Sequence, residues 1–448
     1  MKLDPSKRII HKKCSIYCKN MKTNRPSKVF DCVVVGMGPA GICSAIKLMG
    51  TKTETLLLDS NDYIGGMAFE TDVNLQSING FPPESNFGER VVGSQKMANQ
   101  IIKDVYKMFN NYGLPYSKVH LHLNKLSNSE EKIDFEKKND VYSYPVKVKV
   151  LEKMTKNILK DLLASQNVKI QLKTRVKEIV KGSIKQWGIF TVDDSGKKDY
   201  LETESLILGT GKLSANWITD LYNKLGIDNN INNKISLGIR IEDKAININR
   251  ILVGQHNPKV KIIENDVISE TFCWCKNGGV ISYGFCDGFL LDGEHLFTKP
   301  TTNSNFGMMV SMDLPKNVSS LEFGLAFMNY INVLGGGRIL MQRLKEFRKN
   351  IINKSNDIKS GDIKPTLKDT TIANVRGYFP ELINNGILSL IDKINTLNPG
   401  SITDNALIYA PVVERIFPDT QLDKSMETNL KGIYIVGDCS GASPALVS

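Results

Sequence analysis

The chain carries one glycine-rich stretch, residues 33–46, which reads VVVGMGPAGICSAI. An apolar, β-branched run comes before it, and small apolar residues of helical character follow from Pro39. Glycines spaced G-x-G-x-x-G between a buried strand and a helix let backbone N–H groups approach a pyrophosphate, and the helix N-terminus adds positive charge. The stretch therefore predicts a strand–helix–strand unit that binds a dinucleotide. Its predicted phosphate-binding residues are Gly36, Gly38, Pro39, Ala40 and Gly41.

An acidic residue ends the next predicted strand. Residues 54–58 read ETLLL, and Asp59 follows 18 residues after Gly41. An acid at about this distance typically binds the ribose hydroxyls of a dinucleotide. Gly36 would then form the tight turn, Gly38 the close approach to the phosphates, and Gly41 the contact between helix and strand. The alternative, a strand–helix turn that is merely tight, leaves Asp59 unexplained.

Two further apolar segments, distant in the sequence, are also followed directly by a glycine. Residues 204–211 read ESLILGTG, and residues 431–438 read KGIYIVGD. In a doubly wound sheet the carboxyl ends of such strands can converge on one crevice, where ligands bind. We therefore expect these segments and the strand at 29–35 to build a single site.

Four motifs favour FAD over NAD as the dinucleotide. After the first glycine motif, Asp59 is followed by NDYIGGM, and then ILGTG resembles an internal Ala-Thr-Gly strand. Residues 427–441, ETNLKGIYIVGDCSG, resemble a terminal signature in which Thr428 leads to the strand and Asp438 binds the ribityl chain. This order resembles that of the glutathione-reductase-type, two-dinucleotide-binding flavoprotein superfamily. The remaining predicted FAD-binding residues are Asp59, Ser60, Gly65, Gly66, Met67, Val176, Thr210, Gly211, Gly437 and Asp438.

A closer family resemblance extends over about residues 30–448. The blocks LILGTGKLSANWITDLYNKLGI, SLGIRIE, SETFCWCKNGGVISYG, NSNFGMM and GGGRILMQRL resemble the predicted FAD-dependent dehydrogenases, a largely uncharacterised bacterial and archaeal family. The piece TFCWCKNGG is the most distinctive. Separately, GGMAFETDVNLQSINGFP at 65–82 is similar to the thioredoxin reductase segment that packs near the isoalloxazine. The resemblance implies an oxidoreductase with a flavin domain, an inserted substrate domain and no settled substrate.

Three features depart from these relatives. Lys212 follows the internal glycines where relatives usually carry Arg, and PVVE at 411–414 lacks an acid directly after its proline. The superfamily also follows its terminal Gly-Asp strand with a long helix, whereas seven residues follow Gly441 here. Seven residues form only about two helical turns. The short end predicts a truncated C-terminus and looser retention of FAD.

These patterns predict an α/β fold: a doubly wound parallel-sheet FAD-binding (Rossmann-like) domain with an inserted α+β substrate domain. Apolar residues at helical spacing over 150–164 and alternating runs over 168–192 indicate a helix and strands of the first domain, with Gly182 and Gly188 at turns. The expected FAD-binding domain combines residues 29–75, 150–225 and 401–448, and the expected inserted domain combines residues 76–149 and 226–400.

Most of the positive charge lies in an N-terminal tail. Residues 1–28 hold nine Lys or Arg and one acid, Asp4, and so carry +8 of the formal charge of +11. Such a block indicates a disordered tail and not a nucleic-acid-binding surface on the fold. No apolar run approaches the roughly 18 residues that span a bilayer, and the N-terminus lacks the apolar stretch of a secretory signal. We expect a cytoplasmic protein that binds a small-molecule substrate, with its oligomeric state left open.

Cys273 and Cys275 are the candidates for reactivity. On a strand, residues i and i+2 point to the same face, so the two sulfurs can share one site. One interpretation is a redox-active or flavin-facing thiol pair, activated by a cation or a helix end. The other is two buried, unreactive thiols. Cys286 and His295 would extend the pair to four zinc ligands, but the spacing fits no familiar zinc finger, and we expect no metal.

Three more residues each have two interpretations. His120 and His122 alternate in VHLHL and would either act as acid or base near the flavin or face solvent from a half-buried strand. Arg240, in GIRIE, would either hold a substrate carboxylate through its planar fork or form an ion pair with Glu242.

The expected function is that of an FAD-dependent oxidoreductase, a dehydrogenase or reductase that transfers a hydride between a small organic substrate and flavin. GGGR at 335–338 lacks the spacing of a second dinucleotide motif, so NAD(P)H is expected at most as a transient reductant. Two alternatives remain open. One is a tRNA-modifying flavoprotein, suggested by the basic tail, and the other is a non-catalytic flavin-fold module, suggested by the short C-terminus.

Overall fold

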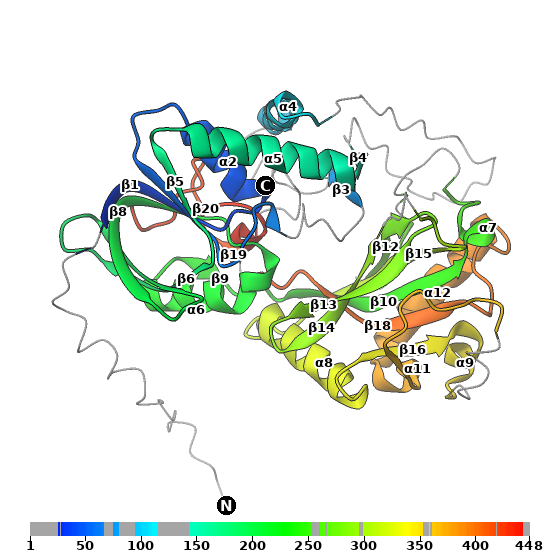
Figure 1. Cartoon of the computed structure of the whole chain (residues 1–448). Coiled ribbons are helices and arrows are strands. Elements are labelled where there is room, and N and C mark those ends of the chain that lie inside the picture. Colours follow the sequence, from blue (N-terminus) through cyan, green and yellow to red (C-terminus); the bar gives the residue numbers. More distant parts are fainter. Residues whose placement is uncertain are drawn as a thin grey trace, which may run out of the picture.

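The computed structural model shows two main sheets, each with helices packed against it (Figure 1). The structure describes residues 26, 28–66, 75–79, 95–114, 143–252, 258, 260–264, 267–294, 299–352, 358, 361–417 and 419–441.

The first sheet is built around the strand that precedes the glycine motif. Across the sheet the strands are β5 (Val168–Gln171), β2 (Thr55–Leu58), β1 (Lys28–Val35), β8 (Lys198–Leu208), β7 (Trp187–Asp193) and β6 (Thr174–Lys181), with β20 (Ile433–Ile435) also beside β8. β5, β2, β1, β8 and β20 run parallel. β8 pairs in parallel with β20 over residues 206–208 and antiparallel with β7 over residues 198–203.

Helices cover both faces of this sheet. They are α2 (Pro39–Leu48), α4 (Gln95–Asn111), α5 (Val148–Ala164) and α6 (Ala215–Leu225). On one face Ile42 of α2 and Ile158 of α5 pack in one apolar cluster with Val34 of β1. On the other face Ile218 of α6 packs in a cluster with Val33. Neighbouring strand residues point to opposite faces, so β1 is buried on both. The doubly wound α/β fold predicted from the sequence is confirmed.

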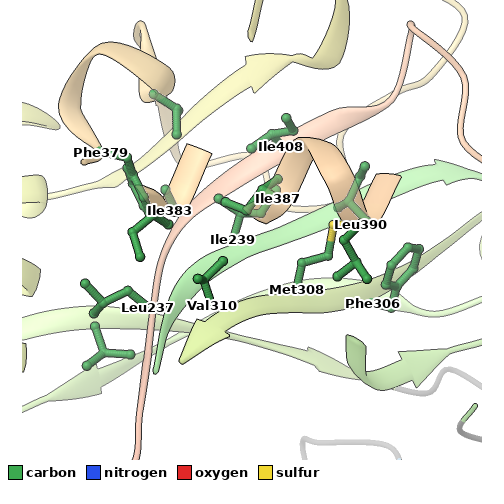
Figure 2. Packing of buried hydrophobic residues seen from close by; sticks show 14 of the residues in the cluster. Leu237, Ile239, Phe306, Met308, Val310, Phe379, Ile383, Ile387, Leu390 and Ile408 are labelled. Atoms are coloured by element: carbon green, nitrogen blue, oxygen red, sulfur yellow. The ribbon is translucent and has the colours of Figure 1, made fainter. Parts of the chain in front are cut away.

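The second sheet is mainly antiparallel. Its strands, in spatial order, are β11 (Lys261–Glu264), β12 (Val267–Cys275), β15 (Asn303–Asp313), β10 (Lys234–Lys244), β18 (Leu407–Glu414), β16 (Ile339–Arg343) and β17 (Thr370–Ile372). Only β16 and β17 pair in parallel among these neighbours. Helix α12 (Glu381–Leu397) lies across the sheet, and Ile383, Ile387 and Leu390 point toward strand residues that include Met308 (Figure 2). The i, i+4, i+7 spacing places these three side chains on one helix face.

Shorter elements complete the described fold. They are the paired strands β13 (Gly279–Phe285) and β14 (Gly288–Glu294), β3 (Leu75–Asn79) and β4 (Ser143–Lys147), and β9 (Asn229–Asn230) and β19 (Asp419–Thr420); the helices α7 (Ala245–Ile248), α8 (Ser320–Leu334), α9 (Leu344–Lys349) and α11 (Val375–Tyr378); and the 3₁₀ turns η2 (Lys212–Ser214) and η3 (Asp438–Ser440). The β13–β14 hairpin lies between the two main sheets in Figure 1.

Two details differ from the sequence predictions. Gly188 lies inside β7 and not at a turn, and a Cβ there would lie 2.5 Å from the Tyr200 hydroxyl, so close packing explains the glycine. β18 pairs with β10 and β16 in the second sheet, although its residues fall within the predicted FAD-binding segment 401–448. That segment therefore contributes to both sheets. The predicted division into two domains otherwise stays a prediction.

Candidate functional site

The carboxyl ends of β1, β8 and β20 meet at one edge of the first sheet. A Cβ on Gly36 would lie 2.4 Å from the Gly209 carbonyl oxygen. A Cβ on Gly437 would lie 2.9 Å from the Ala40 Cβ. Only glycine permits such close approach of the backbone to neighbouring atoms. Gly36 and Gly437 therefore allow the three glycine motifs to lie against one another. The structure thus assembles in space the motifs that the sequence placed far apart.

The first glycine motif has one crowded position and one open position. A Cβ on Gly41 would lie 1.8 Å from the Gly36 carbonyl oxygen, whereas a Cβ on Gly38 would have nothing within 4 Å. Gly38 is the N-cap of α2, Pro39 begins the helix, and no side chain caps it. The free N–H groups of the first helical turn lie beside this open space. That combination is typical of a phosphate-binding helix N-terminus.

Asp59 holds the glycine motif from the end of β2. Its Oδ2 accepts a hydrogen bond from the Met37 N–H at 2.6 Å, and its Oδ1 accepts one from the Asn61 N–H at 2.8 Å. Burial raises the pKa of Asp59, although these hydrogen bonds oppose the shift. Each carboxylate oxygen accepts more than one hydrogen bond, so Asp59 keeps acceptor capacity for a ribose hydroxyl. Ser60, next to it, is exposed.

The Gly65–Gly66 turn closes over the same loop. The Gly65 N–H donates to the Met37 carbonyl oxygen at 2.8 Å. A Cβ on Gly66 would lie 3.1 Å from the Gly38 Cα, and Gly66 has φ +54°. Both predicted glycines therefore contact the first glycine motif, at Met37 and Gly38, directly.

The end of β8 contributes Thr210 and Gly211. Thr210 Oγ1 lies 2.6 Å from Ser214 Oγ, and Gly211 has φ +68° with open space where a Cβ would stand. Val176 is placed differently from the other predicted cofactor residues. It lies in β6, 6% exposed, within the apolar cluster under the end of β2. Its side chain packs in the core, and its predicted contact with the cofactor stays a prediction.

Asp438 begins the short η3 turn after β20, and Gly437 before it has φ +76°. Asp438 is partly exposed, but its surroundings desolvate the carboxylate and raise its pKa to about 6. Lys212 acts in the opposite direction and Glu414 in the same direction. Asp438 is therefore close enough to Lys212 and Glu414 for the three charges to influence one another.

Lys212 and Glu414 form an ion pair that joins the two sheets. Lys212 Nζ lies 2.7 Å from Glu414 Oε1, and the two side chains are 15% and 34% exposed. Tyr283, on β13, is the third member, because Lys212 Nζ lies 5.6 Å from the centroid of its ring. In the sequence, Lys212 and the PVVE segment stand out only as departures from relatives. Nothing in their local sequence indicates that they meet. We call Lys212, Tyr283 and Glu414 the intersheet cluster.

Cys273 and Cys275 lie in a second polar cluster, around a buried arginine. Arg240 of β10 is fully buried, and its Nη2 donates to the Cys273 carbonyl oxygen at 2.7 Å and toward the Cys275 sulfur at 3.1 Å. Its Nη1 lies 3.5 Å from Asp292 Oδ1. Burial alone would lower the pKa of Arg240, but the two thiols and Asp292 raise it. The structure therefore brings both predicted thiols together at a permanent positive charge.

The ion pair of Arg240 with Glu242, one of the two interpretations, is not found. Glu242 instead accepts hydrogen bonds from Thr366 Oγ1 at 2.7 Å and the Tyr409 hydroxyl at 2.5 Å. Arg240 pairs with Asp292 on the neighbouring β14. The ion-pair interpretation therefore named the wrong partner, because a hairpin from a distant segment brings Asp292 to the guanidinium, and the substrate-carboxylate interpretation stays a prediction.

Several sequence predictions lie outside the described residues. They concern the basic tail up to residue 25, Met67, His120, His122, His295 and residues 442–448. Within the described ranges, no group of three or more His, Cys, Asp or Glu side chains is arranged to hold a metal ion. In the same ranges, no helix has the length and apolar character needed to cross a membrane.

Comparison with known proteins gives one family match. Residues 31–215 match the family described as FAD dependent oxidoreductase. No curated protein matches the chain. Among solved structures, p-nitrophenol 4-monooxygenase PnpA from Pseudomonas putida DLL-E4 has a TM-score of 0.40 at 12% identity, over 92% of this chain and 73% of that chain. CtdE in complex with FAD has a TM-score of 0.39 at 10% identity, over 93% and 82%.

Proposed function

We propose that this FAD-dependent oxidoreductase transfers a hydride between a small organic substrate and its FAD, with the substrate held at the intersheet cluster. The match of residues 31–215 to the FAD dependent oxidoreductase family supports FAD as the cofactor and an oxidoreductase activity. The hydride chemistry, the dehydrogenase character and the placement within the glutathione-reductase-type superfamily are proposals. The observation that carries them is the position of Lys212, which directly follows Gly211 of the FAD site and pairs with Glu414 of the other sheet.

The residues at the strand ends suit FAD as a ligand. The open space at Gly38 and the uncapped start of α2 fit a pyrophosphate. Asp59 fits the ribose, and Asp438, in its desolvated position, fits the ribityl hydroxyls. When bound there, FAD supplies the two-electron acceptor and donor chemistry of the reaction. The protein residues then need only bind the substrate, orient it, and accept or donate its proton.

Tyr283 is suited to donate a hydrogen bond to a substrate oxygen. Burial raises the pKa of its phenol to about 12, while Lys212 opposes that shift. The phenol therefore stays protonated at neutral pH. Tyr283 as a residue is partly exposed, and we infer that a ligand can reach its side chain. A carbonyl or hydroxyl oxygen of the substrate is the group that such a donor recognises.

Lys212 supplies positive charge beside this donor. Burial would lower its pKa, but the Glu414 carboxylate outweighs burial and raises the pKa above its ordinary value. A permanently charged ammonium stabilises negative charge that develops on a substrate oxygen. Glu414 remains 34% exposed and keeps free acceptor capacity toward solvent. We infer a substrate with an oxygen at the carbon that exchanges hydride, and NAD(P)H as a transient reductant.

The test is the visible spectrum of the purified protein after FAD addition, followed by anaerobic mixing with NADH, NADPH and candidate hydroxy or carbonyl compounds. Bound FAD should show the absorption bands of oxidised flavin, and one of these reagents should bleach them. A protein that binds FAD but is bleached by none of them contradicts the hydride proposal. A protein that remains colourless contradicts the assignment of the site and favours the non-catalytic module.

A further inference from the structure

The Arg240 cluster has chemistry that hydride transfer does not use. We propose that Cys273 and Cys275 form a thiol–disulfide exchange site, in which Cys273 attacks an external low-molecular-weight disulfide and Cys275 resolves the product. This activity goes beyond the proposed function and requires no flavin.

Backbone geometry presents the two sulfurs differently. The pairing of β12 with β15 shifts register between Phe272 and Cys275, and Cys273 within this bulge has φ +47°. A non-glycine residue in this region is uncommon and is often found at functional sites. Cys273 is partly exposed, whereas Cys275 is fully buried. Cys273 is therefore the cysteine that an external reagent can reach. The Cys275 sulfur lies 4.0 Å from the Cys273 sulfur.

Arg240 places a fixed positive charge against both sulfurs. Its Nη2 lies 3.1 Å from Cys275 Sγ and 3.6 Å from Cys273 Sγ. Its Nη1 is buried and has no hydrogen-bond partner among the described residues, although Asp292 lies 3.5 Å away. A guanidinium does not lose its proton in proteins, so its charge remains available. Because the thiolate is the reactive form of cysteine, Arg240 acts as a positioning residue for it.

Asp292 provides the route for the proton. Its Oδ1 lies 3.3 Å from Cys273 Sγ, and its side chain is 47% exposed, so a proton accepted from the thiol passes to solvent. A hydrogen bond from the Cys275 thiol, together with the nearby Arg240 guanidinium, holds the pKa of Cys273 below its usual range. Burial raises the pKa of Cys275 well above its usual range. The two thiols therefore divide into an attacking and a resolving sulfur.

The thiol–disulfide exchange needs no reactant other than the external disulfide. The Cys273 thiolate attacks one sulfur of an external disulfide, its S–S bond breaks, and one thiolate leaves. Cys275 then loses its proton and attacks the Cys273 sulfur of the mixed disulfide, which releases the second thiolate. The protein dithiol is oxidised to an intramolecular disulfide, and the external disulfide is reduced to two thiols that take up the two protons.

Oxidised glutathione is the probe, used with the full chain in the presence and absence of FAD. Trypsin cleavage after Lys261 and Lys276 yields a peptide, residues 262–276, that contains both cysteines and no others. This peptide should become lighter by two hydrogen atoms, with release of two glutathione thiols per chain. Cys275→Ser should retain one glutathione on Cys273. Cys286→Ser, which removes an exposed thiol outside the cluster, should behave like the wild type.

An unchanged 262–276 peptide in the folded wild type overturns the proposal, as does equal glutathione addition to Cys275 in a Cys273→Ser variant. The role of Arg240 is tested by the pH dependence of Cys273 alkylation. At pH 7 the wild-type thiol should react at least about tenfold faster than Cys286, because a lowered thiol pKa increases the thiolate fraction. Arg240→Lys should move the midpoint of the profile to higher pH. An unmoved midpoint in folded Arg240→Lys assigns Arg240 a structural role only and contradicts its part in the site.

Discussion

Lys212 Nζ lies 2.7 Å from Glu414 Oε1, although 202 residues separate them in the sequence. Lys212 follows the glycines at the end of β8, and Glu414 is the last residue of β18, so the contact joins the two sheets. Tyr283 of the β13–β14 hairpin lies beside the pair. The residues proposed to bind substrate therefore come from both main sheets and the hairpin, next to the proposed FAD site.

Replacing Lys212 should slow the reaction more than it affects the fold. Lys212→Met removes the cation beside Tyr283, and we expect flavin reduction by the wild-type reductant to slow by about 10²-fold or more. Partly exposed ion pairs contribute only about 1 kcal/mol or less to stability, so the urea midpoint should change little. Stopped-flow absorbance under anaerobic conditions measures the rate.

Lys212→Arg is the matched control for this prediction. Arg keeps the positive charge and can pair with Glu414, so most of the rate should remain. Equal rates in Lys212→Met and wild type would remove Lys212 from the proposed substrate site.

Asp438 should make the FAD-free protein less stable as pH rises. Its folded-state pKa of about 6 lies above the ordinary value of 3.8, so folding favours the protonated carboxyl. This contribution is fully present below pH 3.8 and is lost as pH rises through about 6. Asp438→Asn should therefore be more stable than the wild type at pH 8, with the difference shrinking toward pH 4. Urea unfolding at several pH values measures this difference in stability.

Asp194→Asn, at an exposed turn, is the control for Asp438→Asn. A stability difference between Asp438→Asn and the wild type that is constant with pH would contradict the prediction.

Glu202 should have the opposite pH dependence. It is buried in β8 and accepts hydrogen bonds from three consecutive backbone N–H groups, those of residues 183–185, and from the Tyr200 hydroxyl. Burial would raise its pKa, but these hydrogen bonds lower the pKa to about 2 from 4.5. Its stabilising effect is present above pH 4.5 and is lost as pH falls toward 2.

Glu202→Gln should reduce the free energy of unfolding at pH 7 by about 2–3 kcal/mol, because an amide satisfies these donors less well than a carboxylate. The loss should be smaller at pH 3. Glu204→Gln, two residues along the strand and 55% exposed, should have little effect at either pH. Urea unfolding distinguishes the two variants. Equal effects of Glu202→Gln and Glu204→Gln on stability would show that Glu202 does not stabilise the turn at residues 183–185.

The glycine site could be predicted because its causes are local. The spacing of Gly36, Gly38 and Gly41 and the β-branched run before them are requirements of one turn, so they are visible in a short stretch. The positions of Asp59 and Asp438 at strand ends could also be predicted, since Asp59 directly follows β2 and Asp438 lies three residues after β20. The strands that carry them are parallel, and their carboxyl ends meet at one edge of the sheet.

The other clusters could not be predicted because their partners are distant in sequence. An ion pair with Glu242, its near neighbour, was one of two interpretations of Arg240, but a hairpin from elsewhere brings Asp292 to it. The meeting of Lys212 with Glu414 depends in the same way on the packing of two sheets. Gly188 was assigned to a turn by its residue type alone, whereas the Tyr200 side chain across the sheet explains it.

The most direct test of the FAD site is a titration of the protein with FAD, followed by calorimetry, for the wild type and Gly38→Ala. A Cβ on Gly38 meets no protein atom within 4 Å, so the variant should unfold at the wild-type urea concentration. The added methyl group occupies the approach to the phosphates, and FAD affinity should fall about tenfold or more, or about 1.4 kcal/mol. Gly284→Ala, equally open but on the β13–β14 hairpin, should bind FAD like the wild type. Wild-type FAD affinity in Gly38→Ala would contradict the account.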